Sequence, residues 1–88
     1  MRWKPNPDVV AQRLGESMVL VNLATDRILE LNDTAGKLYE MANDGLSKDE
    51  MERRLADEYS VESESLRTEV EGLLQSLTEE QVLSVDGA

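Results

Sequence analysis

The sequence predicts a small α+β domain in which a three-stranded antiparallel sheet precedes three helices. Between residues 9 and 31, short apolar runs alternate with turn-forming residues, which is the pattern of a strand meander. After Asn32 the apolar residues recur every three to four positions, the period of an amphipathic helix. The change falls at Asn32-Asp33-Thr34, whose side chains suit a helix N-cap. A strand therefore runs almost directly into a helix.

The strand region divides at two predicted turns, Gly15-Glu16-Ser17 and residues 22–26. The predicted strands are 9–14, 18–21 and 27–31. Residues 1–8 form an extended lead-in, because each of its two prolines biases the preceding residue away from helix. The last strand, 27–31, lies at an edge of the predicted sheet. An edge strand can capture a further strand, so this edge is the first candidate site.

The helices are delimited by local signals. The first spans about 33–42 and stops before Gly45, which suits a left-handed C-terminal position. The second starts at Ser47-Lys48-Asp49-Glu50, a capping box flanked by the apolar pair of a hydrophobic staple. Residues 60–63 break the pattern, and a leucine-striped third helix follows. The predicted core is Val10, Met18, Leu20, Leu31, Leu38, Tyr39, Leu55, Tyr59, Leu66, Val70, Leu73 and Leu77.

The secondary-structure pattern is weaker at the C-terminal end of the chain. Residues 79–85 form either a last half-turn or a short terminal segment that packs Val82, Leu83 and Val85. Residues 86–88 are expected to be frayed. We treat residues 1–88 as a single domain, because this length supports one modest core.

Composition narrows the function classes. The net charge of −10, from 19 acidic and 9 basic residues, opposes binding to nucleic acid or to an anionic membrane surface. The N-terminus lacks the apolar segment of a signal peptide, and no run is long enough to span a membrane. We therefore expect a soluble cytoplasmic protein with no nucleic-acid and no membrane partner.

Catalysis, metal binding and cofactors are not expected. The chain has no Cys and no His, which removes thiol nucleophiles, zinc sites with sulfur or imidazole ligands, and Ser-His-Asp catalysis. Its carboxylate pairs fall at helix starts or on solvent-facing helix positions, where they complement the helix dipole. The sequence also lacks a glycine-rich phosphate loop and the ligand spacing of a calcium loop.

The candidate site combines the last strand with one flank of the third helix. If that helix lies across the strand, Arg67 and Leu74 form one wall of a groove and residues 28–31 form the other. The alternative is that Val70 and Leu74 belong to the core. The candidate peptide-binding residues are Arg27, Ile28, Leu29, Glu30, Leu31, Leu66, Arg67, Val70, Glu71 and Leu74.

A family resemblance supports this choice. The motifs that carry it are Thr25-x-x-Ile28-x-x-Leu31-Asn32-x-Thr34-Ala35, Gly45-x-Ser47 and Leu55-Ala56-x-x-Tyr59-x-Val61. Between about Pro5 and Leu83 the chain resembles the PqqD-like family, the recognition domains for leader peptides of ribosomally made, modified peptides. It departs from the family at Asp26 and near Gln81, where glycine is usual, and at Ile28, where an aromatic residue is frequent.

The resemblance implies a winged helix-turn-helix-like fold without catalysis. The leader peptide would add as a strand to 27–31 and contact the third helix. The chain looks most like the stand-alone recognition subunit of lasso peptide biosynthesis, a peptide chaperone that works with a leader peptidase and a cyclase. One alternative is the carrier protein of pyrroloquinoline quinone assembly, and another is a winged-helix transcriptional regulator. Under this hypothesis Val70→Glu and Leu74→Glu abolish leader capture more than folding, Leu74→Glu being the more selective.

Overall fold

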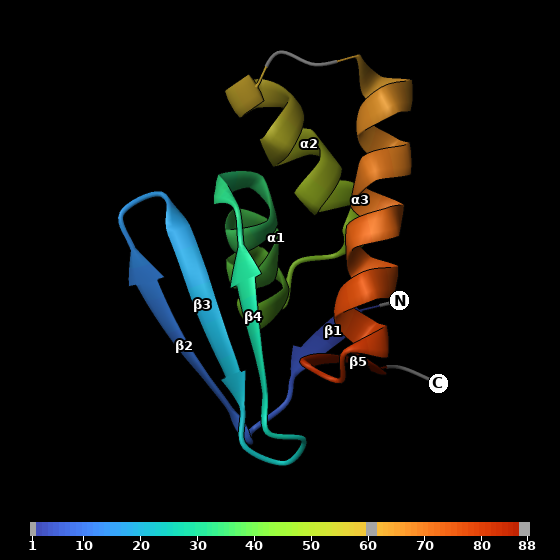
Figure 1. The fold of residues 1–88 in the computed structure, drawn as a ribbon. Coiled ribbons are helices and arrows are strands. Elements are labelled where there is room, and N and C mark those ends of the chain that lie inside the picture. Colours follow the sequence, from blue (N-terminus) through green and yellow to red (C-terminus); the bar gives the residue numbers. More distant parts are fainter. Residues whose placement is uncertain (1, 60–61, 87–88) are drawn as a thin grey trace.

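The computed structural model describes residues 2–59 and 62–86, which form an α+β fold with three helices and two antiparallel sheets (Figure 1). The predicted fold class is confirmed. In chain order the elements are β1 (Arg2–Pro5), β2 (Val9–Leu14), β3 (Ser17–Asn22), β4 (Arg27–Leu31), α1 (Asp33–Asn43), α2 (Lys48–Tyr59), α3 (Ser63–Glu79) and β5 (Leu83–Asp86).

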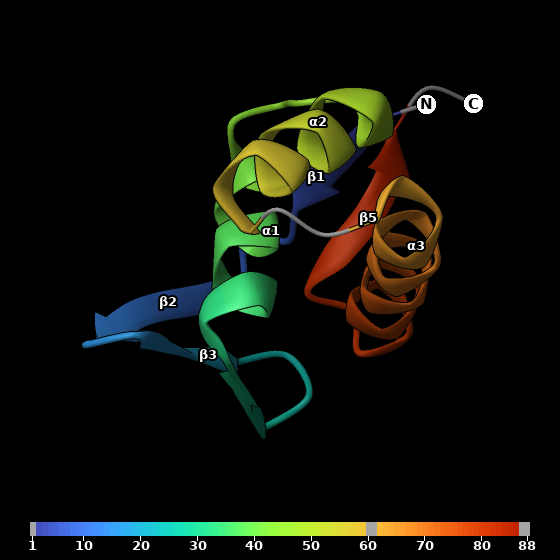
Figure 2. The same ribbon diagram turned by 90° about the horizontal axis from the view of Figure 1, so that it is seen from above.

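The larger sheet is the predicted meander. Its strand order is β2-β3-β4, so β2 and β4 are its two edges. The bounds of β2 and β4 are as predicted, and β3 is one residue longer at each end. The three helices all lie on one side of this sheet (Figure 2). Met18 and Leu20 are buried beneath them, because alternate residues of a strand point to the same face.

The smaller sheet joins the two ends of the chain. β1 pairs with β5, and Trp3 lies opposite Val85. Residues 1–8 were predicted only as an extended lead-in; the pairing of Arg2–Pro5 and the burial of Trp3 in the core were not predicted. Such a pairing leaves no local signal, because its partners are about 80 positions apart in the chain.

The C-terminal predictions have mixed outcomes. Val82 and Leu83 are buried as predicted, whereas Val85 is 47% exposed. Asp86 is the last residue of β5, so the frayed tail was predicted to begin too early. Residues 87 and 88 of that tail lie outside the described residues.

The predicted helix caps are confirmed. The Asn32 side chain accepts a hydrogen bond from the Ala35 N–H at 2.9 Å and starts α1. At α2, the Ser47 N–H donates to Glu50 at 3.2 Å, and the Glu50 N–H donates to the Ser47 hydroxyl at 3.3 Å. The Ser47 N–H and hydroxyl lower the pKa of the Glu50 carboxyl. Hydrogen bonds between residues three positions apart therefore fix the starts of both helices.

Three residues of the predicted core are not fully buried: Val10, Tyr59 and Leu73. Val10 is 55% exposed, because it lies on the sheet face away from the helices. On α3 the predicted core residue is Leu73, but Leu74 is buried instead and Leu73 is only half-buried. Neighbouring helix positions differ by about 100°. Two adjacent leucines therefore satisfy the same periodic pattern, and only the packing of the helix decides which one enters the core.

Two turns place non-glycine residues in the left-handed region. Asp26 has φ 58° and Gln81 has φ 62°. Both are near positions where the resembled family usually has glycine. The Gln81 carbonyl accepts hydrogen bonds from the side-chain amides of Asn6, at 2.7 Å, and of the buried Asn22, at 3.3 Å. These bonds hold the end of α3 against the larger sheet.

We expect Gln81→Gly to raise the free energy of unfolding by about 0.5 kcal/mol. A left-handed backbone costs an L-residue roughly 1–2 kcal/mol, and the extra chain entropy of glycine offsets part of the gain. The two hydrogen bonds at this position use the carbonyl and are kept. Urea denaturation measures the change, with Gln75→Gly inside α3 as the matched control, where we expect a loss of about 1 kcal/mol. Equal losses in both variants would contradict the expected relief of strain.

Candidate functional site

The β4 strand presents a free edge and two different faces. Arg27, Leu29 and Leu31 lie opposite Asn22, Leu20 and Met18, which are all buried, so these three side chains point to the helical side. Ile28 and Glu30 point to the outer face, and Ile28 is 70% exposed. A peptide paired with this edge would therefore place alternate side chains toward α3 and toward the outer face.

The α3 helix has one flank that contacts α2. Glu71 binds Lys48 at 2.7 Å, and Arg67 contacts Glu52 at 3.4 Å. The ammonium group of Lys48 lowers the pKa of Glu71, and the Glu71 carboxylate raises the pKa of Lys48. These contacts fix Arg67 and Glu71 on the side of α3 that faces α2.

The opposite flank of α3 faces β4. Arg27 at the start of β4 forms an ion pair with Glu80 at the end of α3, at 2.8 Å. Leu73 lies seven residues before Glu80, which is close to two helical turns and places it on the same flank. Glu69 and Ser76 share that flank by the same geometry. Seen from above, α2 and the larger sheet lie in different directions from α3, α2 toward the top of the view and the sheet toward the bottom (Figure 2).

The burial of α3 favours the alternative in which Val70 and Leu74 belong to the core. Arg67 and Glu71 face α2, and Leu74 is 3% exposed within the core. Leu66 and Val70 are also buried. The strand half of the site, residues 27–31, keeps its free edge. On α3 the flank toward β4 carries Leu73, which the sequence pattern assigned to the core and which is half-buried.

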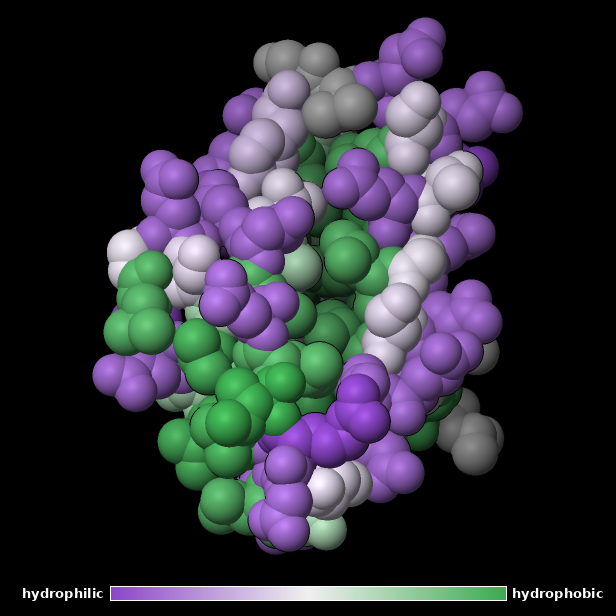
Figure 3. Space-filling model, in the orientation of Figure 1, coloured by the Kyte–Doolittle hydropathy of each residue, from purple (hydrophilic) through white to green (hydrophobic). Residues whose placement is uncertain are grey.

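The surface between β4 and α3 is a groove with an apolar lining. Figure 3 shows it as a recess beside α3 in which green side chains lie below the surrounding polar surface. Leu29 of β4 and Leu73 of α3 are half-buried, and both pack against the core. One end of the groove is closed by the Arg27–Glu80 ion pair. Such a groove can hold apolar side chains while the edge strand pairs with their main chain.

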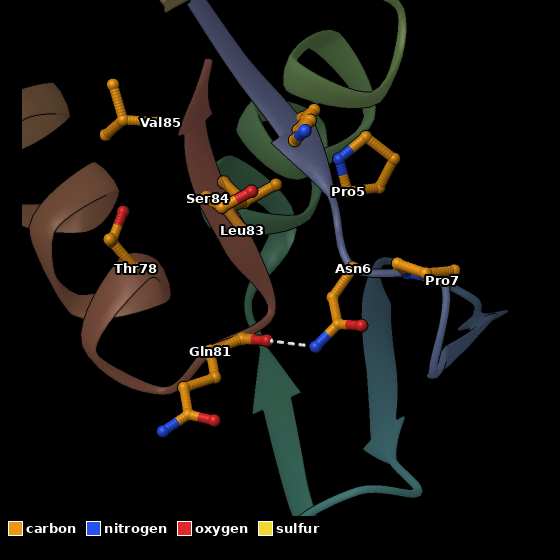
Figure 4. A pocket seen from close by; sticks show the side chains of 9 residues that line it. Pro5, Asn6, Pro7, Thr78, Gln81, Leu83, Ser84 and Val85 are labelled. Carbon is orange, nitrogen blue, oxygen red and sulfur yellow. Dashed lines mark hydrogen bonds between the residues drawn. The ribbon is translucent and has the colours of Figure 1, made fainter. Parts of the chain in front are cut away.

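A separate cavity of about 540 Å³ lies between the smaller sheet and the end of α3 (Figure 4). Its lining residues are Lys4, Pro5, Asn6, Pro7, Thr78, Gln81, Leu83, Ser84 and Val85. The Asn6 amide spans it to the Gln81 carbonyl. The lining includes no carboxylate.

Residues 2–59 and 62–86 contain no group of three or more Asp, Glu, His or Cys side chains that could hold a metal ion. Within the same ranges, no helix has the length and apolarity needed to cross a membrane.

Comparison with known proteins gives a family and two solved structures. The family model described as "Coenzyme PQQ synthesis protein D (PqqD)" matches residues 17–83, from β3 to the start of β5. No curated protein sequence matches the chain.

Both solved structures align over nearly the whole chain. "TbiB1 in Complex with the TbiA(beta) Leader Peptide" is 20% identical, with a TM-score of 0.88 over 97% of this chain and 99% of that one. "Lasso peptide synthetase B1 complexed with the leader peptide" is 25% identical, with a TM-score of 0.87 over 97% and 100%. Because each alignment covers 97% of this chain, the alignments include nearly all of the paired strands β1 and β5.

Proposed function

The chain belongs to the PqqD family, and from this premise we propose that it is a non-catalytic adaptor that binds the leader region of a ribosomally made precursor peptide. The observation that carries the proposal is the free edge of β4 beside the half-buried Leu73 of α3. The two structures of the same fold are each described as complexes with a leader peptide, which supports the same assignment.

The proposed binding mode is strand addition to residues 27–31. The peptide main chain would pair with the unpaired N–H and C=O groups of β4, and alternate side chains would enter the groove between Leu29 and Leu73. Ordering a flexible peptide costs about 2–5 kcal/mol. The burial of apolar leader side chains, at roughly 25 cal/mol per Å², has to exceed that cost. The groove and the strand edge are thus both needed.

The adaptor would act as one domain and present the bound peptide to processing enzymes. We propose a leader peptidase and a cyclase of lasso peptide biosynthesis as those enzymes, because one of the similar structures is described as a lasso peptide synthetase B1. The family, whose model is that of a coenzyme PQQ synthesis protein, favours a second candidate, a carrier for pyrroloquinoline quinone synthesis. Affinities for the two kinds of precursor peptide distinguish these functions.

Amide exchange with and without leader tests the binding mode. The probe is the TbiA(beta) leader peptide, which is bound in one of the two similar structures. We expect slower exchange at 27–31 and resonance shifts around Leu73 and Ser76, because these groups line the groove. Shifts concentrated at Arg67 and Glu71 would place the peptide on the α2 flank and contradict the proposed site.

Two further measurements on the purified protein test whether it is catalytic and whether it binds DNA. Mass spectrometry of the precursor incubated with this protein alone is expected to show no cleavage or cyclisation, and a reproducible mass change would contradict the adaptor assignment. A transcriptional regulator would bind duplex DNA at low salt. The net charge of −10 predicts no retention on heparin.

A further inference from the structure

The side chain of Asn22 is buried and connects the larger sheet to the end of α3. It is 1% exposed, and within residues 2–59 and 62–86 it is the one buried residue that is polar and not aromatic. Its amide donates a hydrogen bond to the Gln81 carbonyl at 3.3 Å, and its side-chain oxygen accepts one from the Ala24 N–H at 3.0 Å. Buried polar side chains that are hydrogen-bonded favour one arrangement of the elements they join. Asn22 therefore holds β3, the turn before β4 and the end of α3 in one arrangement.

This contact lies at the closed end of the groove between β4 and α3. Asn22 is the cross-strand neighbour of Arg27, the first residue of β4. Gln81 directly follows Glu80, which forms the ion pair with Arg27 at 2.8 Å. The buried hydrogen bond and the ion pair thus connect the same two elements, the sheet and the end of α3, at neighbouring positions.

Of the contacts that hold the end of α3, the one from Asn22 is the buried contact to the sheet. The Arg27 side chain is 62% exposed, and ion pairs in water contribute little to a fixed geometry. The Asn6 amide also donates to the Gln81 carbonyl, at 2.7 Å, but it comes from the connection between β1 and β2 and this bond is exposed to solvent (Figure 4). The spacing between β4 and α3 at this end therefore depends mainly on Asn22.

We propose that Asn22 is a positioning residue for the leader site, because its amide sets the spacing at which β4 and Leu73 contact the same peptide. Strand addition places the peptide main chain at hydrogen-bond distance from β4. The peptide side chains then reach Leu73 over a narrow range of α3 positions. A gap of about 0.5–1 Å already forfeits a quarter to a half of a van der Waals contact. This inference rests on the proposed function, whereas the hydrogen bonds of Asn22 do not.

Asn22→Leu tests the proposal, since leucine has the same branched shape as asparagine but no donor. Calorimetric titration with the TbiA(beta) leader peptide measures the affinity. We expect binding to weaken about tenfold, comparable to the loss of one buried hydrogen bond. The variant should stay folded in a urea denaturation curve, because the Gln81 carbonyl keeps its bond from Asn6 and the new side chain is apolar.

A second variant and a matched control separate the two bonds of Asn22. Asn22→Ser keeps a hydroxyl that can accept the Ala24 N–H in the turn, but its shorter side chain does not reach Gln81. It should therefore weaken leader binding as Asn22→Leu does. Asn6→Ala is the control, because it removes the other side-chain amide from the same carbonyl without changing the contact to the sheet. Its leader affinity should stay within about twofold of the wild type, less than the effect of one hydrogen bond.

Two measurements distinguish positioning from a loss of stability. In a double-mutant cycle, Asn22→Leu should weaken binding much less in a Leu73→Ala chain than in the wild type, because the contact that Asn22 positions is already absent. Residual dipolar couplings of the α3 amides, recorded without leader, measure the direction of that helix relative to the sheet. They should change in Asn22→Leu and stay as in the wild type in Asn6→Ala.

Three results would overturn the proposal: wild-type affinity in both Asn22 variants, an equal loss in Asn6→Ala, or additive losses in the cycle with Leu73→Ala. The failure of the proposed function has a different signature, since the wild-type chain itself would then not bind leader. In that case the dipolar couplings still decide whether Asn22 sets the direction of α3, and unchanged couplings in Asn22→Leu would contradict that role.

Discussion

Leu73→Glu is expected to abolish leader binding while the chain stays folded. Leu73 is half-buried on the flank of α3 that faces β4, so its side chain can contact a strand added to that edge. A carboxylate there would be desolvated against apolar leader side chains without a partner, at a cost of several kcal/mol. Each 1.4 kcal/mol weakens binding about tenfold, so we expect a loss of roughly a hundredfold or more.

The neighbouring residue supplies the control. Leu74 is 3% exposed and lies in the core, so Leu74→Glu buries a charge and is expected to cost about 4 kcal/mol or more of stability. Leu73→Glu should cost only about 1 kcal/mol, because its side chain is already partly in water. Calorimetric titration with the leader and a urea denaturation curve for each variant separate the two effects.

This expectation reverses the one from the sequence, in which Leu74→Glu was the more selective change. Normal leader affinity in a folded Leu73→Glu variant would show that the peptide does not use this flank of α3. A Leu74→Glu variant that melts like the wild type would show that the packing of α3 differs from the one described.

Trp3→Ala is expected to lower the free energy of unfolding by about 3–5 kcal/mol. Trp3 is 8% exposed, lies in β1 opposite Val85 and packs in the core. Small domains are stable by only about 5–15 kcal/mol in total, so this single change removes much of the stability. The size of this loss measures how much the packing of the paired strands β1 and β5 contributes to the stability of the domain.

Circular dichroism during urea unfolding is the suitable readout, because the substitution removes the single Trp of the chain. Lys4→Ala changes the next residue of β1, whose side chain is exposed, and should shift the curve by no more than about 0.5 kcal/mol. A loss below 1 kcal/mol for Trp3→Ala would mean that β1 contributes little to the fold.

The sequence determined the features that depend on a few neighbouring residues. The bounds of β2 and β4, a cap at Asn32 or Asp33 and the Ser47–Glu50 capping box were predicted, because each follows from local alternation or local hydrogen bonding. At Asp26, where the resembled family usually has glycine, the backbone is left-handed, with φ 58°. The edge strand of the candidate site could be identified for the same reason, since strand order in a meander follows chain order.

Only the tertiary structure decided which surfaces meet. The sequence could not show that β1 pairs with β5, because their contact closes almost the whole chain and has no local pattern. It also could not choose between Leu73 and Leu74, or between the two flanks of α3. Those choices depend on the rotation of the helix about its axis, which the core packing and the Arg27–Glu80 and Lys48–Glu71 ion pairs set together. A helical period fixes the relative angles of side chains, but only the neighbouring elements fix the direction in which they point.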